Sequence, residues 1–290
     1  MRLFQCERSM DIYGITEHWT HNLSPFLFQF PRSWPIVGGN GIRYYALAYI
    51  VGFLIAYALL ILAYRKKRSP YDPEQVSDLV TFNIVGIIIG GRLGYMLFYD
   101  FGHFISNPLT FFQFWNGGMA SHGGMIGVAI ATILFVKLRR QSLLNTADLI
   151  VSVSAPGLLL GRIANFINGE LWGHPSDVPW AVIFPLADLK PRHPSQLYEA
   201  FCEGLLLFIY MQLRFWGKLG KTPPTGQLTG EFLLLYSILR MFCELFREPD
   251  APLIMDISRG QFYSIGTTLA GIGFILYARI TAKSDNNRIA

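Results

Sequence analysis

Long apolar stretches separated by short polar segments run through most of the chain. A helix needs about 20 apolar residues to cross the hydrocarbon core of a bilayer. Seven stretches reach or approach that length: 42–64, 79–99, 117–136, 146–168, 196–214, 226–246 and 261–280. The pattern predicts an all-α, polytopic membrane protein of about seven transmembrane helices. It divides the chain into an N-terminal segment (1–41), a transmembrane domain (42–281) and a tail (282–290).

Glycines recur at intervals of four residues within the second, third and fourth stretches. The pairs are Gly86 and Gly90, Gly123 and Gly127, and Gly157 and Gly161. This spacing lets transmembrane helices approach closely. We therefore expect tight helix packing at these positions.

Composition agrees with a lipid-facing surface. The 290 residues are 52% hydrophobic and only 15% charged, whereas soluble domains carry about 25% charged residues. The three cysteines form neither a CxxC pair nor a zinc-ligand spacing, so we expect no metal and no cofactor. Residues 1–41 lack the apolar core and cleavage site of a secretory signal peptide.

The positions of the basic residues predict an orientation. Clusters follow the first, third, fifth and seventh stretches: Arg65, Lys66, Lys67 and Arg68; Lys137, Arg139 and Arg140; Arg214, Lys218 and Lys221; Arg279, Lys283 and Arg288. Cytoplasmic loops carry an excess of Lys and Arg, so the N-terminus is expected outside and the tail in the cytoplasm. The net charge of +5 is thus a topology signal and does not indicate nucleic acid.

Three arginines lie inside the apolar stretches: Arg92, Arg162 and Arg240. A mid-helix arginine costs about 2.5–3.5 kcal/mol on insertion scales and is a functional candidate, although a snorkelling or paired structural arginine is the alternative. In the predicted topology all three lie toward the outer face. Other polar residues are expected at the same level: Tyr45, His122, Glu199 and Glu203. The pattern predicts one cavity open to the outer leaflet.

Helical spacing groups these candidates further. One helical face carries Tyr236, Arg240, Glu244 and Arg247, and another carries Arg162, Asn165 and Gly169. Glu244 can pair with Arg240 or with Arg247. Two arginines from different helices suit a phosphate, because their planar forks donate paired hydrogen bonds to its oxygens. At this depth the phosphate would belong to a phospholipid headgroup.

His122 stands among small residues in the sequence SHGG. Such a histidine is often a packing residue, but its depth beside the arginines makes it a candidate for proton transfer near neutral pH. No Ser/His/Asp order, HExxH pattern, Walker loop or dinucleotide-binding loop is evident.

Five motifs resemble those of prolipoprotein diacylglyceryl transferases. The signature lies at residues 161–173, which read GRIANFINGELWG. Supporting motifs are GGRLGY at 90–95, WNGGM at 115–119 running into SHGG at 121–124, RHPSQLYE at 192–199 and FREPD at 246–250. The resemblance covers roughly residues 40–280, in the expected order.

The resemblance implies seven transmembrane helices in a bacterial cytoplasmic membrane, with the site toward the outer leaflet. It implies phosphatidylglycerol as donor, the lipobox cysteine of a prolipoprotein as acceptor, and a thioether and glycerol phosphate as products. The family's functional residues match at Tyr45, His122, Arg162, Asn165, Glu170, Gly173, Tyr236, Arg240, Glu244 and Arg247. The chain departs from the family in a long segment before residue 41 and a short loop between Gly173 and Arg192.

In the implied reaction a thiolate attacks the glyceryl carbon that bears the phosphate ester. Arg162 and Arg240 would stabilise the leaving phosphate, and Glu244 would hold an arginine in place. His122 would either accept the thiol proton or orient the donor lipid. A flippase for an anionic lipid would instead place polar groups through the inner half of the bilayer, and a metal-dependent alcohol phosphotransferase would need clustered aspartates; the sequence shows neither pattern.

Overall fold

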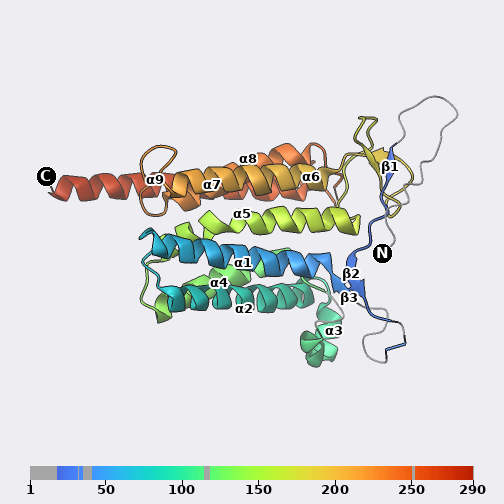
Figure 1. Cartoon of the computed structure of the whole chain (residues 1–290), viewed down its shortest axis with the longest axis horizontal. Helices are drawn as coiled ribbons and strands as arrows, with labels where there is room; N and C mark the ends of the chain where they lie inside the picture. The colour runs from blue at the N-terminus through green and yellow to red at the C-terminus, as the bar shows by residue number, and fades with distance from the viewer. Residues whose placement is uncertain (1–17, 32, 35–40, 114–117, 250–251, 290) are drawn as a thin grey trace. The chain divides into compact units, whose positions relative to one another are not determined.

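The computed structural model describes residues 18–31, 33–34, 41–113, 118–249 and 252–289; the side chains of 121–122 and 285–289 lie outside this description. It is mostly helical (Figure 1). The helices are α1 (Tyr44–Arg65), α2 (Pro73–Phe98), α3 (Phe101–Ser106), η1 (Pro108–Phe112), α4 (Ser121–Leu138), α5 (Leu143–Asn168), α6 (Ser195–Glu199), η3 (Ala200–Leu206), α7 (Leu207–Phe215), α8 (Gln227–Glu244) and α9 (Arg259–Ile289). Helices thus form over all seven predicted stretches.

Within the described residues, four helices are long and apolar enough to cross a membrane: α1, α2, α5 and the Arg259–Ser284 part of α9. In α4 the apolar part, Gly123–Leu138, is shorter. The 18 residues of α8 contain Glu231, Arg240 and Glu244, which lower its hydropathy. The run from α6 to α7 is interrupted by η3, a stretch of π-helix. Length and hydropathy therefore identify fewer spans than the seven that the sequence predicts.

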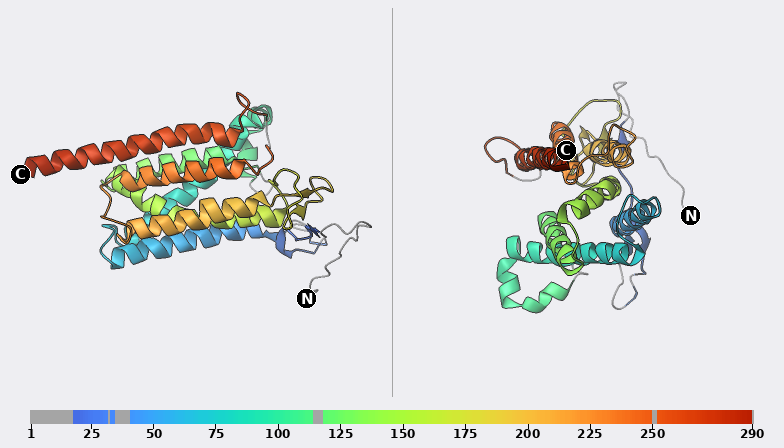
Figure 2. Two further views of the ribbon diagram at one scale, coloured as in Figure 1. Left: turned by 90° about the horizontal axis from the view of Figure 1, so that it is seen from above. Right: turned by 90° about the vertical axis from the view of Figure 1, so that its left-hand side faces the viewer.

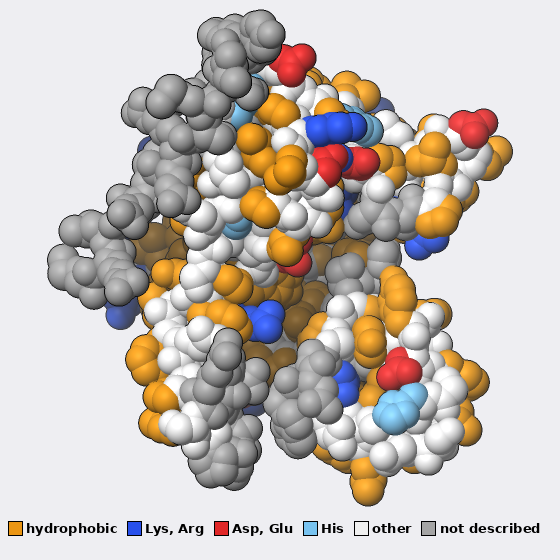
Figure 3. Space-filling model, turned by 90° about the vertical axis from the view of Figure 1, so that its right-hand side faces the viewer, with side chains coloured by type: hydrophobic (Ala, Val, Ile, Leu, Met, Phe, Trp, Pro, Cys, Tyr) orange, Lys and Arg blue, Asp and Glu red, His pale blue; other side chains and the backbone are white. Residues whose placement is uncertain are grey.

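Large apolar side chains are exposed along these helices, as a lipid-facing surface requires. Examples are Leu54, Ile89, Ile130 and Leu276. Figure 3 shows the end of the molecule at which the helices meet their loops, where hydrophobic side chains are mixed with charged ones. An α-helix hydrogen-bonds its own backbone polar groups, which is the condition for crossing hydrocarbon. At Pro156 of α5, which has no N–H, the Ser152 carbonyl accepts from the Gln212 side chain at 2.7 Å instead.

The chain forms two compact units, Met1–Ala56 with Val151–Ala290, and Tyr57–Ile150. In the second unit, α2 packs on α4 through glycines. A Cβ on Gly86 would lie 2.6 Å from the carbonyl oxygen of Gly127, and one on Gly94 would lie 2.7 Å from the Cα of Gly123. The expected close approach of the first two glycine pairs is confirmed. For the third pair, a Cβ on Gly52 of α1 would lie 3.3 Å from the Cα of Gly157, so the close approach is confirmed at Gly157. A Cβ on Gly161 would meet no described atom within 4 Å.

In the first unit, α8 and α9 run side by side, as both figures of the ribbon show (Figures 1 and 2). A Cβ on Gly230 would lie 2.7 Å from the carbonyl oxygen of Gly271, and Ser237 hydrogen-bonds Thr267 at 2.5 Å. A buried apolar cluster joins α5, α7 and α8 through Ala155, Leu207, Met211 and Leu228.

In the described residues, two small sheets lie outside the helices of the first unit, mostly in segments for which the sequence predicts no element. Strand β1 (Trp19–Thr20) pairs in parallel with β4 (Val182–Ile183), which pairs antiparallel with β5 (Pro191–Arg192). Strands β2 (Phe26–Gln29) and β3 (Gly41–Arg43) form a hairpin that leads directly into α1. Strands of two to four residues are too short to leave a period-2 hydrophobic pattern in the sequence.

Candidate functional site

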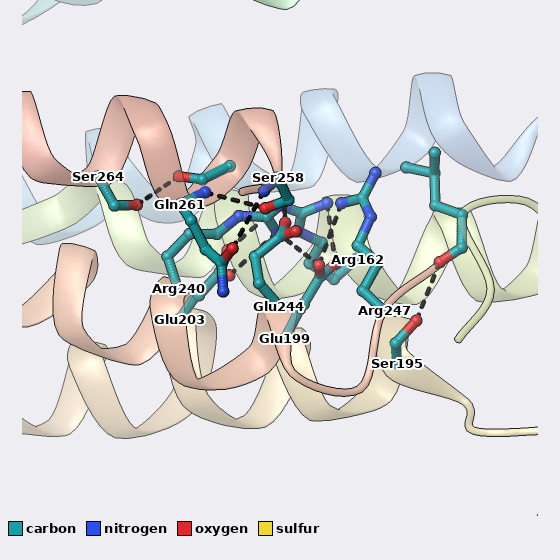
Figure 4. A network of polar contacts seen from close by, with 12 residues as sticks. Arg162, Ser195, Glu199, Glu203, Arg240, Glu244, Arg247, Ser258, Gln261 and Ser264 are labelled. Carbon is teal, nitrogen blue, oxygen red and sulfur yellow. Dashed lines mark hydrogen bonds and ion pairs between the residues drawn. The ribbon is translucent and has the colours of Figure 1, made fainter. Parts of the chain in front are cut away.

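Charged side chains from three segments of the first unit converge in one buried network (Figure 4). Arg162 comes from the last turns of α5, Glu199 ends α6, and Glu203 lies in η3. Arg240 and Glu244 lie one turn apart in α8, so both face the same side of that helix. Arg247 follows just after the end of α8.

Glu199 and Glu203 bridge the two arginines that the sequence singles out. Arg162 Nη1 lies 3.0 Å from Glu199 Oε2, and its Nη2 donates to Glu203 Oε2 at 3.2 Å. Arg240 Nη1 donates to Glu199 and, at 3.3 Å, to Glu203 Oε1. Arg162 and Arg240 are therefore brought together, as predicted, and each contacts both carboxylates.

Two further contacts complete the network. Arg240 Nη2 donates to Glu244, and Arg247 Nη1 donates to Glu199 Oε1 at 3.1 Å. Of the two partners that the sequence allows for Glu244, the structure shows Arg240. The side chains of Glu199 and Glu203 are 0% exposed.

The network contains three guanidinium groups and three carboxylates, so its formal charge is zero when all are ionised. This balance matters because an uncompensated buried charge is strongly destabilising. Glu199 and Glu203, together with Glu244, balance the three arginines. The sequence argument instead named a substrate phosphate as the partner that Arg162 and Arg240 share. That argument missed the two glutamates as partners. The available signal was a pair of carboxylates four residues apart in an apolar stretch.

A tight turn at the end of α5 carries the next group of predicted residues. Gly169 has a left-handed backbone (φ 66°), which ends the helix. Asn165 Nδ2 donates to Glu170 Oε1 at 2.8 Å, and Asn168 Nδ2 donates to the same oxygen at 3.1 Å. Gln196 Nε2 donates to the Glu170 carbonyl at 2.6 Å, which joins the turn to α6. Asn165 and Glu170 are thus in direct contact.

Gly173 and Arg247 form an isolated antiparallel bridge. A Cβ on Gly173 would lie 2.6 Å from atoms of His193, so the close approach requires glycine. Arg192 secures this region: its guanidinium donates to the Gly173 carbonyl at 3.0 Å, to Asp188 and to Glu248. The loop between Gly173 and Arg192 is therefore tied to the segment that carries Arg247.

The two predicted tyrosines occupy different surroundings. Tyr236 stacks on Phe232 along α8, with ring centroids 6.1 Å apart. It lies one turn before Arg240, on the same face of α8. Tyr45 lies in the first turn of α1 and packs edge-on against Tyr49 at 5.3 Å.

Arg92 belongs to the other unit and has a different environment. Its guanidinium donates to the backbone carbonyls of Phe111 at 3.1 Å, Gln113 at 3.1 Å and Gly118 at 3.2 Å, as well as to that of Thr110. It thereby holds the segment after α2 in place. This bonding is that of a structural arginine, the alternative that the sequence leaves open for Arg92.

His122 lies in the first turn of α4, and its side chain is outside the described part of the structure. Its role stays a prediction. Among the described residues, no group of three His, Cys, Asp or Glu side chains could hold a metal ion.

Comparison with known proteins decides the family. A sequence model described as prolipoprotein diacylglyceryl transferase matches residues 31–277. The chain belongs to the prolipoprotein diacylglyceryl transferase family. That match contains every residue of the buried network and of the turn after α5.

Curated relatives in this family are similar over most of their length. The chain is 44% identical to the phosphatidylglycerol–prolipoprotein diacylglyceryl transferase of Pseudoalteromonas translucida over 256 residues, which cover 86% of this chain and 94% of that protein. It is 45% identical to that of Rhodospirillum rubrum over 262 residues, which cover 88% and 95%.

Proposed function

We propose that the chain transfers the diacylglyceryl group of phosphatidylglycerol to the lipobox cysteine of a prolipoprotein, the first step of bacterial lipoprotein maturation. The names and the close similarity of its relatives support this activity. The observation that carries the mechanism is the pairing of Arg162 and Arg240 with the same two buried glutamates. Such pairing fixes both guanidinium groups before substrate binds.

In the proposed step the cysteine thiolate of the acceptor attacks the glyceryl carbon that bears the phosphate ester. A carbon–sulfur bond forms as the carbon–oxygen bond to phosphate breaks. The electron pair of the broken bond leaves with glycerol phosphate, which takes up the proton that the thiol releases. A thiol reacts as its thiolate and has an ordinary pKa near 8.5, so the step needs a proton acceptor, for which His122 is our candidate.

Charge grows on the phosphate oxygen as the bond breaks. Fixed donors at that position stabilise the transition state without reorganising during the reaction. A guanidinium carries five N–H donors, more than the contacts of Arg162 with Glu199 and Glu203 use. Arg162 and Arg240 can thus bind phosphate while the glutamates hold them in place. Tyr45, Asn165, Glu170, Gly173, Tyr236, Glu244 and Arg247 complete the proposed substrate-binding set.

Mass spectrometry tests the activity. Purified protein is incubated with phosphatidylglycerol and a lipobox peptide, and we expect the peptide to gain one diacylglyceryl mass with an equal amount of glycerol phosphate released. A peptide with serine in place of the cysteine is the control and stays unmodified. Movement of lipid between leaflets without any peptide modification would instead support a flippase. Chelation is expected to leave the rate unchanged, because the proposed chemistry uses no metal.

The proposed topology has seven spans in the cytoplasmic membrane, with the N-terminus outside, the C-terminus in the cytoplasm and the site toward the outer leaflet. The basic clusters after alternate helices support it. Reporter fusions after Arg68, Arg140, Lys221 and Asp285 should all report a cytoplasmic location. A periplasmic signal from the fusion after Arg140 would contradict this topology.

A further inference from the structure

A short segment before the matched family region contacts the turn after α5. We call Trp19, Thr20 and His21 the strap; they precede residue 31, where the family match begins. The strap adds a parallel edge strand to β4, with Trp19 opposite Val182. The His21 backbone N–H continues this pairing by donating to the Ile183 carbonyl at 2.8 Å.

The His21 side chain turns from this strand onto α5. Its Nε2 lies 2.8 Å from the carbonyl oxygen of Phe166. Because a carbonyl only accepts, Nε2 is the donor. The ring packs edge-on against Phe166 at 5.7 Å and obliquely against Phe184 at 5.5 Å between centroids. His21 is 8% exposed, so the contact is buried.

The carbonyl that His21 contacts belongs to the last turn of α5. The Phe166 oxygen also accepts the N–H of Gly169 at 3.0 Å. A Cβ on Gly169 would lie 3.1 Å from two atoms of the His21 ring. The His21 ring therefore packs directly against Gly169, the residue at which the chain leaves α5.

The same turn presents two residues of the proposed substrate-binding set. Asn165 precedes Phe166, and Glu170 follows Gly169. Besides their side-chain bond, the Glu170 N–H donates to the Asn165 carbonyl at 3.2 Å. A shift at Phe166 or Gly169 would therefore move both side chains together. Arg162 is less dependent on the turn, because Glu199 and Glu203 hold its guanidinium.

We propose that the strap is a positioning element for substrate binding, in which His21 and Trp19 hold the α5 turn so that Asn165 and Glu170 meet phosphatidylglycerol in one fixed geometry. This inference rests on the proposed function. It assigns a role to a segment that lies outside the region shared with the family model. Since the strap acts on binding residues and not on the arginine network, its loss weakens donor binding more than it slows the chemical step.

The test is a separation of KM from kcat in the full-length protein. His21→Phe keeps an aromatic ring of similar size but removes the Nε2 donor. His103→Phe, at an exposed position in α3, is the matched control. We expect His21→Phe to raise the KM for phosphatidylglycerol, measured as its mole fraction in mixed micelles, by roughly five- to tenfold, the effect of one lost hydrogen bond. We expect kcat to stay within about twofold, and His103→Phe to match the wild type.

Two more variants keep the test decisive. Trp19→Leu removes the ring contact of Trp19 with Phe166 and should raise KM in the same direction by a smaller factor, so it decides the question alone if His21→Phe does not fold. His21→Gln supplies a side-chain N–H again and should recover part of the loss. An unchanged KM in the folded strap variants, or a fall in kcat with KM unchanged, would overturn the proposal. A wild-type protein that modifies no peptide would instead overturn the proposed function.

Discussion

Arg240 pairs with Glu199 across α8 and α6, inside stretches that the sequence predicts to cross the membrane. The two residues are 41 positions apart, and both are buried. Glu199 also contacts Arg162 and Arg247, so one carboxylate serves three arginines. This makes Glu199 the centre of the charge network.

Removing the Glu199 carboxylate should destabilise the protein more than removing the Glu244 carboxylate. Glu199→Gln leaves three buried guanidinium groups short of a partner, whereas Glu244→Gln weakens the ion pair of Glu244 with Arg240. Breaking a buried ion pair costs about 3–5 kcal/mol. Thermal unfolding is followed with a thiol-reactive dye that labels the buried Cys202 and Cys243. The unfolding temperature should fall further in Glu199→Gln than in Glu244→Gln. An equal or larger fall for Glu244→Gln would contradict the central position of Glu199.

Arg92 should matter for folding and little for chemistry. Its bonds go to backbone carbonyls after α2. Arg92→Ala therefore leaves the buried Thr110 carbonyl without this donor, at a cost of about 1–3 kcal/mol, and removes the donor from three partly buried carbonyls. We expect a lower unfolding temperature, with transfer per folded molecule closer to wild type than in Arg162→Ala. Normalising the rate to the monodisperse peak in size-exclusion chromatography separates the two effects. Equal losses of transfer rate per folded molecule in Arg92→Ala and Arg162→Ala would contradict the structural role of Arg92.

His122→Gln tests the proposed proton acceptor. If His122 takes the thiol proton, the variant should transfer slowly while still binding phosphatidylglycerol, and its rate should rise with pH toward the ordinary thiol pKa. Rates at pH 6–9 and lipid binding are measured on the same preparation. Near wild-type turnover over that whole range would make His122 a packing residue.

The ion pair between Asp188 and Arg192, in the loop after Gly173, should make the stability of the fold depend on pH. Two hydrogen bonds from Arg192, at 3.0 and 2.8 Å, lower the pKa of Asp188 from 3.8 to about 2. A carboxyl whose pKa is lower in the folded state than in the unfolded state stabilises the fold at pH values above its unfolded-state pKa. This contribution is lost as the pH falls through the folded-state pKa. The unfolding temperature of the wild type should therefore fall across this interval more steeply than that of Asp188→Asn. Parallel profiles of unfolding temperature against pH in the wild type and Asp188→Asn would show that the Asp188–Arg192 pair contributes nothing to stability.

Helix positions could be predicted from sequence because a bilayer demands long apolar segments with satisfied backbones. The grouping of Tyr236, Arg240 and Glu244 on one face followed from helical periodicity alone. The pairing of Glu199 and Glu203 with Arg162 and Arg240 could not be predicted, because it depends on how three separate helical segments pack. No periodicity within one helix encodes such a contact.

The strap escaped prediction for a related reason. Two residues of β1 pair with two residues of β4, more than 160 positions later in the chain. Such a short pairing has no alternating pattern to detect. The turn at Gly169 was visible as part of a motif, but the contact with His21 depends on the position of the whole sheet beside α5.

The most direct test of the central claim is the transfer rate of purified Arg162→Ala under saturating phosphatidylglycerol and lipobox peptide. The variant should be less stable, because its network has one positive charge fewer than carboxylates. It should still fold, because Glu199 keeps Arg240 and Arg247 as partners and Glu203 keeps Arg240. Removing one preorganised donor to a developing charge costs about 10²–10³ in kcat, and Arg162→Lys should not restore the full rate because an ammonium lacks the planar fork. The account predicts a loss of that size per folded molecule. A rate close to wild type would contradict the role of Arg162 in stabilising the leaving phosphate.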